Sequence, residues 1–174
     1  MKKVIMAVLA SAAIFMAGCD REPPTVERMT AISKAVGKTA AVAVELSKTK
    51  QEVRDGIAQV LDIVSKVVPA ENETFAEKWA PIVNEEVDKL VEAGKLSDAQ
   101  AVLVKNALYV ACDGIDLIFV RYPKAKEYQE LVSAAVTGFC DGFNSVASFA
   151  VAPDELDADA MKYLKGTIKA RSAK

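Results

Sequence analysis

The fold class is decided by SDAQAVLVKNALYVACDGIDLIFVRYP, residues 97–123. Apolar residues recur in this stretch every three or four positions, which is the period of one face of an α-helix. Ser97 and Gln100 form a capping box, the Ser/Thr-x-x-Glu/Gln pattern that starts helices. Pro123 disfavours helical backbone in the residue before it, so it ends the pattern. The stretch therefore predicts one long helix.

A heptad-like apolar face lies upstream of this helix and runs from Met29 to Val67. The face predicts either one long helix or two helices with a bend near residues 48–51. Thr39 and Lys50 fall on the same face and break it. Thr25 is in a position to cap the start of this segment.

Three further helices complete the pattern. Thr74 and Glu77 form a capping box at the start of one helix, and Gly94 fits its end. Residues 128–147 form another apolar segment, and Asp154 can cap a last, more polar helix. No stretch alternates strictly between apolar and polar residues, as a half-buried strand would. Because the loops are short, the sequence predicts an all-α, antiparallel bundle of four to six helices.

The composition argues against several classes of function. The chain has no His, 22 basic residues and 24 acidic residues, with a net charge of −2. Without His it lacks the usual general base, the commonest metal ligand and every Ser-His or Cys-His nucleophile. A mildly acidic chain without a basic run is also a poor partner for nucleic acid. We therefore expect no enzymatic activity, no cofactor, no metal and no nucleic-acid partner.

The N-terminal segment has the features of an export signal. Two lysines at positions 2–3 precede an uninterrupted run of apolar and small residues at 4–16. A bilayer span needs about 20 residues, so this run is too short to cross a membrane. A basic start, a short apolar run and small residues at its end are typical of a secretory signal peptide. Here the small residues Ala17 and Gly18 lead directly into Cys19.

This ending resembles the lipobox of bacterial lipoproteins: an aliphatic residue, a small residue, Gly or Ala, and then Cys. The resemblance implies that the Cys19 thiol receives a diacylglyceryl group, that the chain is cut before Cys19, and that the new amine can be acylated. Two or more acyl chains anchor a protein stably to a membrane. The expected organisation is a signal peptide over residues 1–18, a lipidated tether over 19–24 and a helical-bundle domain over 25–174.

Three details qualify the lipobox resemblance. Met16 stands where the lipoprotein pattern prefers Leu. The alternative is an ordinary secreted protein that is cut near Ala17 and leaves Cys19 unmodified. Asp20 resembles the signal that keeps enterobacterial lipoproteins in the inner membrane. The resemblance therefore implies a bacterial envelope protein that is anchored by lipid and faces the periplasm, with the inner membrane favoured.

A repeated Cys-Asp-Gly tripeptide places the other two cysteines on consecutive predicted helices. Cys112 and Cys140 are 28 residues apart, on either side of the turn at Pro123. On an antiparallel hairpin they would come to similar heights, and an even pair of cysteines in an exported protein is typical of a disulfide. We therefore predict a bond between Cys112 and Cys140, with two buried free thiols as the alternative.

Three carboxylates accompany this repeat. Asp113, Asp116 and Asp141 could form an oxygen-rich cation site across the two helices. Calcium sites usually also draw on loops and backbone carbonyls, so solvated or helix-flanking carboxylates are favoured.

Residues 131–152 are long enough to span a bilayer, but Asp141 and several polar residues favour a buried bundle helix. Trp79 is likewise expected in the core rather than in a groove.

Three functions are compatible with this pattern. The favoured one is a non-enzymatic lipoprotein that binds a protein or another envelope component at the membrane surface. Exclusion- and immunity-type lipoproteins have this layout, although no motif links the chain to them. The alternative is a carrier of a small apolar ligand in the bundle core, which predicts an apolar cavity. The third is an enzyme with an unrecognised carboxylate site.

Overall fold

The fold consists entirely of helices in the described part of the chain. The computed structural model describes residues 22–70, 72–146, 154 and 156–173. The helices are α2 (Val26–Ala43), η1 (Leu46–Lys48), α3 (Gln51–Val64), α4 (Phe75–Glu92), α5 (Asp98–Arg121), η2 (Pro123–Glu127), α6 (Gln129–Ser145) and α7 (Ala158–Ser172). η1 and η2 are short 3₁₀ turns. Since none of the described residues is in a strand, the predicted all-α bundle is confirmed.

The N-terminal apolar segment forms two helices, as one of the two alternatives predicted. Glu45 follows α2 in the left-handed conformation, with φ of 53°, which cannot continue a right-handed helix. The chain then makes the η1 turn and enters α3. The apolar face is preserved across this break, because both helices bury its residues in one core. These buried residues are Met29, Val36, Leu46, Val53, Ile57, Val60 and Val64.

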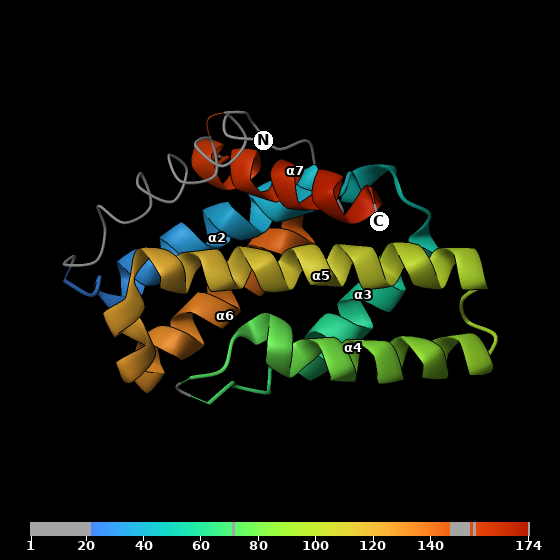
Figure 1. Cartoon of the computed structure of the whole chain (residues 1–174), viewed down its shortest axis with the longest axis horizontal. Helices are drawn as coiled ribbons and strands as arrows, with labels where there is room; N and C mark the ends of the chain where they lie inside the picture. The colour runs from blue at the N-terminus through green and yellow to red at the C-terminus, as the bar shows by residue number, and fades with distance from the viewer. Residues whose placement is uncertain (1–21, 71, 147–153, 155, 174) are drawn as a thin grey trace, which may run out of the picture.

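Helices α4 and α5 form an antiparallel hairpin (Figure 1). Both predicted capping boxes are present, at Thr74 for α4 and at Ser97 for α5. Between the helices, Gly94 adopts φ of 69°, and the Lys95 N–H donates to the Leu90 carbonyl at 2.9 Å. This is a Schellman ending, which satisfies the last carbonyls of α4 and reverses the chain. Local sequence thus determines the hairpin.

Helix α6 packs chiefly against α2 rather than against α5, so the predicted α5–α6 hairpin pairing is wrong. A Cβ at Gly138 would lie 2.5 Å from the Thr30 carbonyl oxygen, and a Cβ at Gly142 would overlap the Lys34 carbonyl. Gly37 makes the same close approach from the α2 side. Because Thr30 faces Gly138 and Lys34 faces Gly142, α2 and α6 run in the same direction. Glycines spaced four residues apart allow two helix backbones this close.

Asp157 holds α7 in place. Its carboxylate accepts the Ala160 N–H at 2.7 Å and binds Arg121 at 2.6 and 3.1 Å, while its own N–H donates to Thr39 Oγ1 at 2.8 Å. Desolvation acts to raise the pKa of Asp157, but the Arg121 guanidinium and the backbone N–H groups hold it below its ordinary value. The predicted cap at Asp154 is therefore wrong, because Asp157 has tertiary partners that fix the start of α7.

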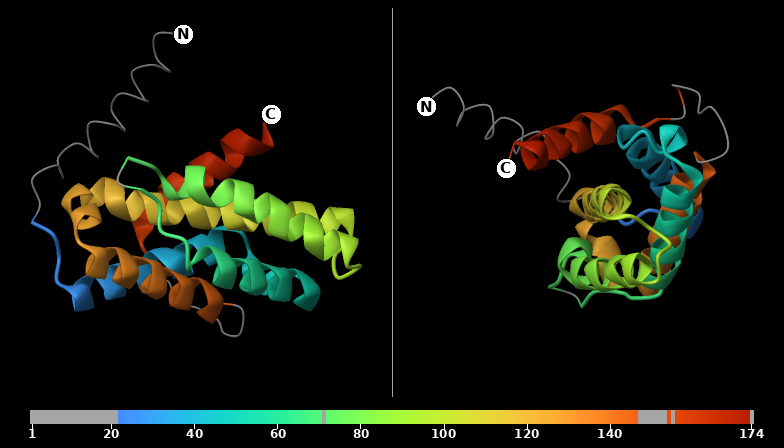
Figure 2. Two further views of the ribbon diagram at one scale, coloured as in Figure 1. Left: turned by 90° about the horizontal axis from the view of Figure 1, so that it is seen from below. Right: turned by 90° about the vertical axis from the view of Figure 1, so that its right-hand side faces the viewer.

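The two ends of the bundle are built from different elements. One end contains the start of α2, the end of α5, η2 and the start of α6. The opposite end contains the α4–α5 turn (Figures 1 and 2). Within the described ranges, none of the helices combines the length and the apolar character that crossing a membrane requires. Helix α6, the candidate span, ends at Ser145 and packs in the bundle.

Candidate functional site

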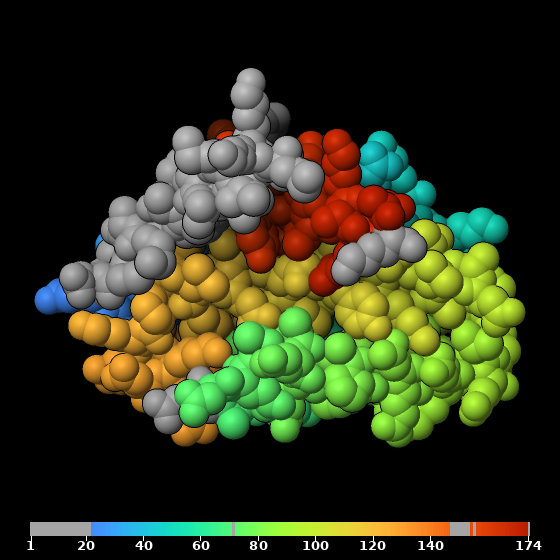
Figure 3. All heavy atoms as spheres, viewed as in Figure 1, coloured from blue at the N-terminus to red at the C-terminus, as the bar shows by residue number. Residues whose placement is uncertain are grey.

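A groove of about 320 Å³ opens where η1, α3, α5 and α7 meet, and we call it the α3–α5–α7 groove. Figure 3 shows α7 lying across the surface, and Arg171 near its end reaches Tyr109 and Asp113 in the middle of α5. Most of the side chains that line the groove are aliphatic. The lining residues are Ala43, Val44, Glu45, Leu46, Thr49, Val53, Ile57, Leu103, Asn106, Ala107, Val110, Ile168, Arg171 and Ser172.

Two neighbouring aliphatic residues of α5 are exposed at the groove, one on its rim and one beside it. Leu103 lines the groove and is 51% exposed, and its neighbour Val102 is 57% exposed outside it. An aliphatic side chain beside an apolar groove can be buried by a partner, which is the usual source of affinity at such sites. The groove therefore offers a surface for apolar groups.

The groove lining carries two charged residues, Arg171 and Glu45, and both are paired; Glu45 Oε1 lies 3.0 Å from Lys48 Nζ. The Arg171 Nη2 atom lies 2.8 Å from Asp113 Oδ2, and the Arg171 guanidinium stacks over the Tyr109 ring at 5.6 Å. Desolvation raises the pKa of Asp113, while the Arg171 charge acts in the opposite direction. Because Asp113 balances the guanidinium, the groove is better suited to an apolar group than to an anion.

The three carboxylates proposed for a cation site are separated. Asp116 accepts the backbone N–H groups of Phe75 and Ala76 at 2.8 and 3.0 Å, so it caps the start of α4. Burial raises the pKa of Asp116, and these two donors counteract the rise. Asp113 binds Arg171, and Asp141 is exposed on α6. Across the described ranges, no group of three or more His, Cys, Asp or Glu residues is placed to hold a metal.

The predicted disulfide is not formed, because Cys112 and Cys140 are both free. The two thiols have different charged neighbours: Asp113 and Asp116 act on Cys112, whereas Asp141 and Asp62 of α3 act on Cys140. This follows from the packing of α6 on α2 instead of α5. Burial, and then the adjacent carboxylates, raise the pKa of each thiol to about 12. Cys19, the predicted lipidation site, lies outside the described residues.

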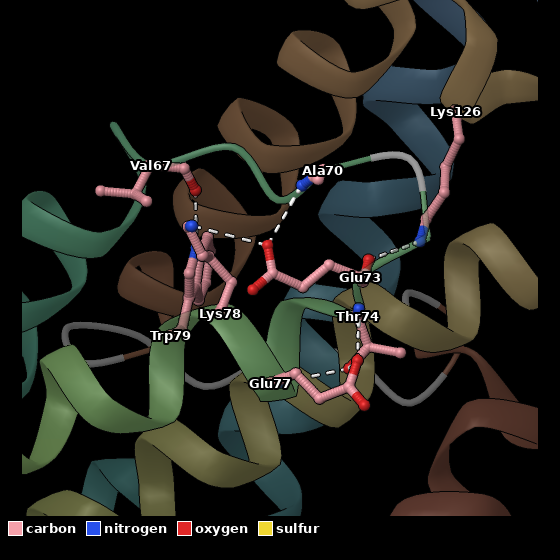
Figure 4. A network of polar contacts seen from close by, with 8 residues as sticks. All are labelled: Val67, Ala70, Glu73, Thr74, Glu77, Lys78, Trp79 and Lys126. Carbon is pink, nitrogen blue, oxygen red and sulfur yellow. Dashed lines mark hydrogen bonds and ion pairs between the residues drawn. The ribbon is translucent and has the colours of Figure 1, made fainter.

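A polar network fixes the loop before α4 (Figure 4). Trp79 Nε1 donates to the Val67 carbonyl at 2.7 Å, and Lys126 Nζ donates to the Glu73 carbonyl at 3.0 Å. Trp79 is fully buried, so its predicted place in the core is confirmed, and Phe75 is buried beside it. A second groove, of about 310 Å³, lies beside this loop, but Lys126 on its lining is occupied by the structural contact.

Sequence reasoning did not find the α3–α5–α7 groove. Ile168 and Arg171 come from α7, whereas Leu103 comes from α5, so no continuous motif brings them together. The sequence does contain one signal, the adjacent aliphatic pair Val102 and Leu103. Neighbouring residues on a helix do not share a face, so such a pair indicates that an aliphatic side chain is exposed.

Comparisons with known proteins add no family to this description. No protein-family model matches the sequence, and neither the curated proteins nor the solved structures contain a significant match. The residues themselves therefore carry the functional argument.

Proposed function

We propose that the chain is a lipid-anchored envelope protein, facing the periplasm, that acts as a non-enzymatic binding module through the α3–α5–α7 groove. The observation that carries the binding role is the groove itself, an aliphatic surface with the half-exposed Leu103 on its rim. The lipobox resemblance at Cys19 supports the anchor, and Asp20 favours the inner membrane. The absence of His from the sequence and the structural use of Asp116 support a role without catalysis.

The groove lies far along α5 from the end of the bundle where the tether joins. Leu103 is near the start of α5, and the tether joins the bundle near the end of α5. At a rise of 1.5 Å per residue, the 17 helical positions from Leu103 to Val120 span about 25 Å. A short tether at one end thus leaves the groove accessible from the periplasm. An exclusion- or immunity-type role is compatible with this layout.

The anchor is tested by Cys19→Ser. We expect this variant to move from the membrane fraction to the soluble fraction of the envelope, because removing the thiol removes the site of diacylglyceryl transfer. Fractionation followed by mass measurement of the N-terminal peptide gives the result. Continued membrane association of the serine variant, without acyl groups, would contradict the anchor.

The groove is tested by crosslinking in cells. A photoreactive residue at Asn106, which is exposed on the groove, should form a discrete adduct with the partner. Leu103→Glu should remove most of the adduct, because it places a charge on the apolar rim. Val102→Glu is the matched control, since Val102 is equally exposed but does not line the groove. An adduct that both variants reduce alike would count against the groove.

The alternative function is a carrier of a small apolar ligand. Its support is the volume of the groove, about 320 Å³, which lies at the small end of the range for ligand sites. The purified protein would then bind a fluorescent apolar probe with one-to-one saturation, and Leu103→Glu would weaken that binding. Saturable probe binding together with no protein adduct at Asn106 would favour the carrier over the binding module.

A further inference from the structure

Three exposed apolar residues lie at the end of the bundle where the tether enters. Val26 is 42% exposed at the first position of α2, Val120 is 56% exposed in the last turn of α5, and Tyr128 is 46% exposed directly before α6. These elements share one end of the molecule (Figures 1 and 2). We call Val26, Val120 and Tyr128 the basal surface.

The chain before α2 also lies at this end. Pro23, Pro24 and Thr25 line a shallow pocket together with Tyr122, the residue that ends α5. The described part of the tether therefore lies at the same end of the bundle as the start of α2 and the end of α5. Its described part ends beside the basal surface.

The reach of the tether sets how far the basal surface can be from a membrane. Only six peptide units join Cys19 to Thr25. A fully extended chain covers about 3.3–3.6 Å per residue, so an acylated Cys19 would hold the start of α2 within about 20 Å of the bilayer. That distance is shorter than α5, whose 24 residues span about 36 Å. The bilayer is therefore the largest apolar partner permanently within reach of this end.

The chemistry of this end fits a bilayer surface. Tyrosine is enriched at membrane interfaces because its ring is apolar and its hydroxyl is polar. Arg28 and Lys124 are exposed there and can meet lipid phosphates, whereas Glu22, Glu27, Glu127 and Glu130 are exposed at the same end. Because the exposed acidic groups outnumber the basic ones, electrostatic attraction does not drive this contact. The tether compensates for this by keeping the local concentration of bilayer surface high.

We propose that the basal surface rests on the bilayer, with Val26, Val120 and Tyr128 in the headgroup region. This inference rests on the proposed anchor at Cys19 and adds an orientation to it. The long axis of α5 then points away from the membrane, and Leu103 and the α3–α5–α7 groove face the periplasm. The basal contact fixes which part of the protein a partner meets.

The orientation is tested on the full chain, expressed in a bacterium that processes lipoproteins and reconstituted into vesicles of phosphatidylethanolamine and phosphatidylglycerol. An environment-sensitive dye is attached in separate samples to Val120→Cys, Tyr128→Cys and the control Val102→Cys. Val102 is a matched control because it is 57% exposed on the same helix, against 56% for Val120. The native thiols react slowly because burial raises the pKa of Cys112 and Cys140, and the unsubstituted chain gives the background.

Lipids that carry a nitroxide near the headgroup should reduce the fluorescence of the dyes at positions 120 and 128 by about half. The dye at position 102 should be unchanged. The reason is that basal residues would enter the membrane interface to a depth of about 5–10 Å. A chain that floats with the vesicles but shows equal quenching at all three positions would overturn the orientation and leave the anchor intact. A chain that fails to float would overturn the anchor, and the basal contact with it. Tyr128→Glu should keep flotation and reduce quenching at 120.

Discussion

Gly142→Val is expected to destabilise the fold by about 3 kcal/mol or more, the range of severe overpacking. A Cβ at Gly142 would overlap the backbone of Lys34, and backbone cannot rotate away as a flexible side chain can. The two helices would have to separate, which would disturb the packing of Phe139 and Phe143, two fully buried side chains of α6. The loss should occur even though valine is intrinsically the better helix former. Equilibrium unfolding in urea, followed by circular dichroism, measures it.

Gly166→Ala is the matched control for this prediction. Gly166 is also a glycine inside a helix, α7, but a Cβ there would have nothing within 4 Å. This variant should gain up to about 1 kcal/mol of stability from helix propensity alone. Equal effects of the two substitutions would show that α2 and α6 are not in close backbone contact.

Trp79→Ala is expected to cost about 3–5 kcal/mol, which is typical of removing a large aromatic side chain from a core. Trp79 is fully buried and packs edge-on against Phe75 with ring centroids 5.1 Å apart. Its Nε1 also donates to the Val67 carbonyl, so the substitution leaves a partly buried acceptor without its donor.

Trp79→Phe separates the two contributions of this side chain. It keeps an aromatic ring in the core but removes the hydrogen bond to Val67, so about 1–2 kcal/mol of the loss should remain. Val102→Ala is the surface control, and it should leave the unfolding midpoint nearly unchanged. A loss for Trp79→Ala no larger than that for Val102→Ala would place the indole outside the core.

Features that depend on a few neighbouring residues could be predicted from the sequence. The capping boxes at Thr74 and Ser97 were found because each one is complete within four residues. The end of α4 at Gly94 has the same origin, since glycine accepts the left-handed conformation without steric cost. These local signals gave the helices and the all-α class.

Features that depend on distant residues could not be predicted in the same way. Thr39 interrupts an apolar face in the sequence, but in the structure it is buried, donates to the Ala35 carbonyl and accepts from the N–H of Asp157. The prediction of a Cys112–Cys140 bond assumed that consecutive helices are neighbours in space. The close contact between α2 and α6 overrides this expectation, because the glycines of α6 fit α2 more closely than α5.

The pairing of α2 with α6 also constrains the order in which the chain can fold. The first helix of the bundle meets its main partner about a hundred residues later, and the hydrogen bond between Thr39 and Asp157 spans 118 residues. Contacts of such long sequence separation form late and slow the folding rate, because closing the loop costs entropy first. Helix α2 also contacts α5, but most of the surface on which it packs is supplied by α6, which comes later in the chain. The α2–α6 contact and the docking of α7 therefore have to wait until most of the chain is present, whereas the α4–α5 hairpin can form from its own local contacts.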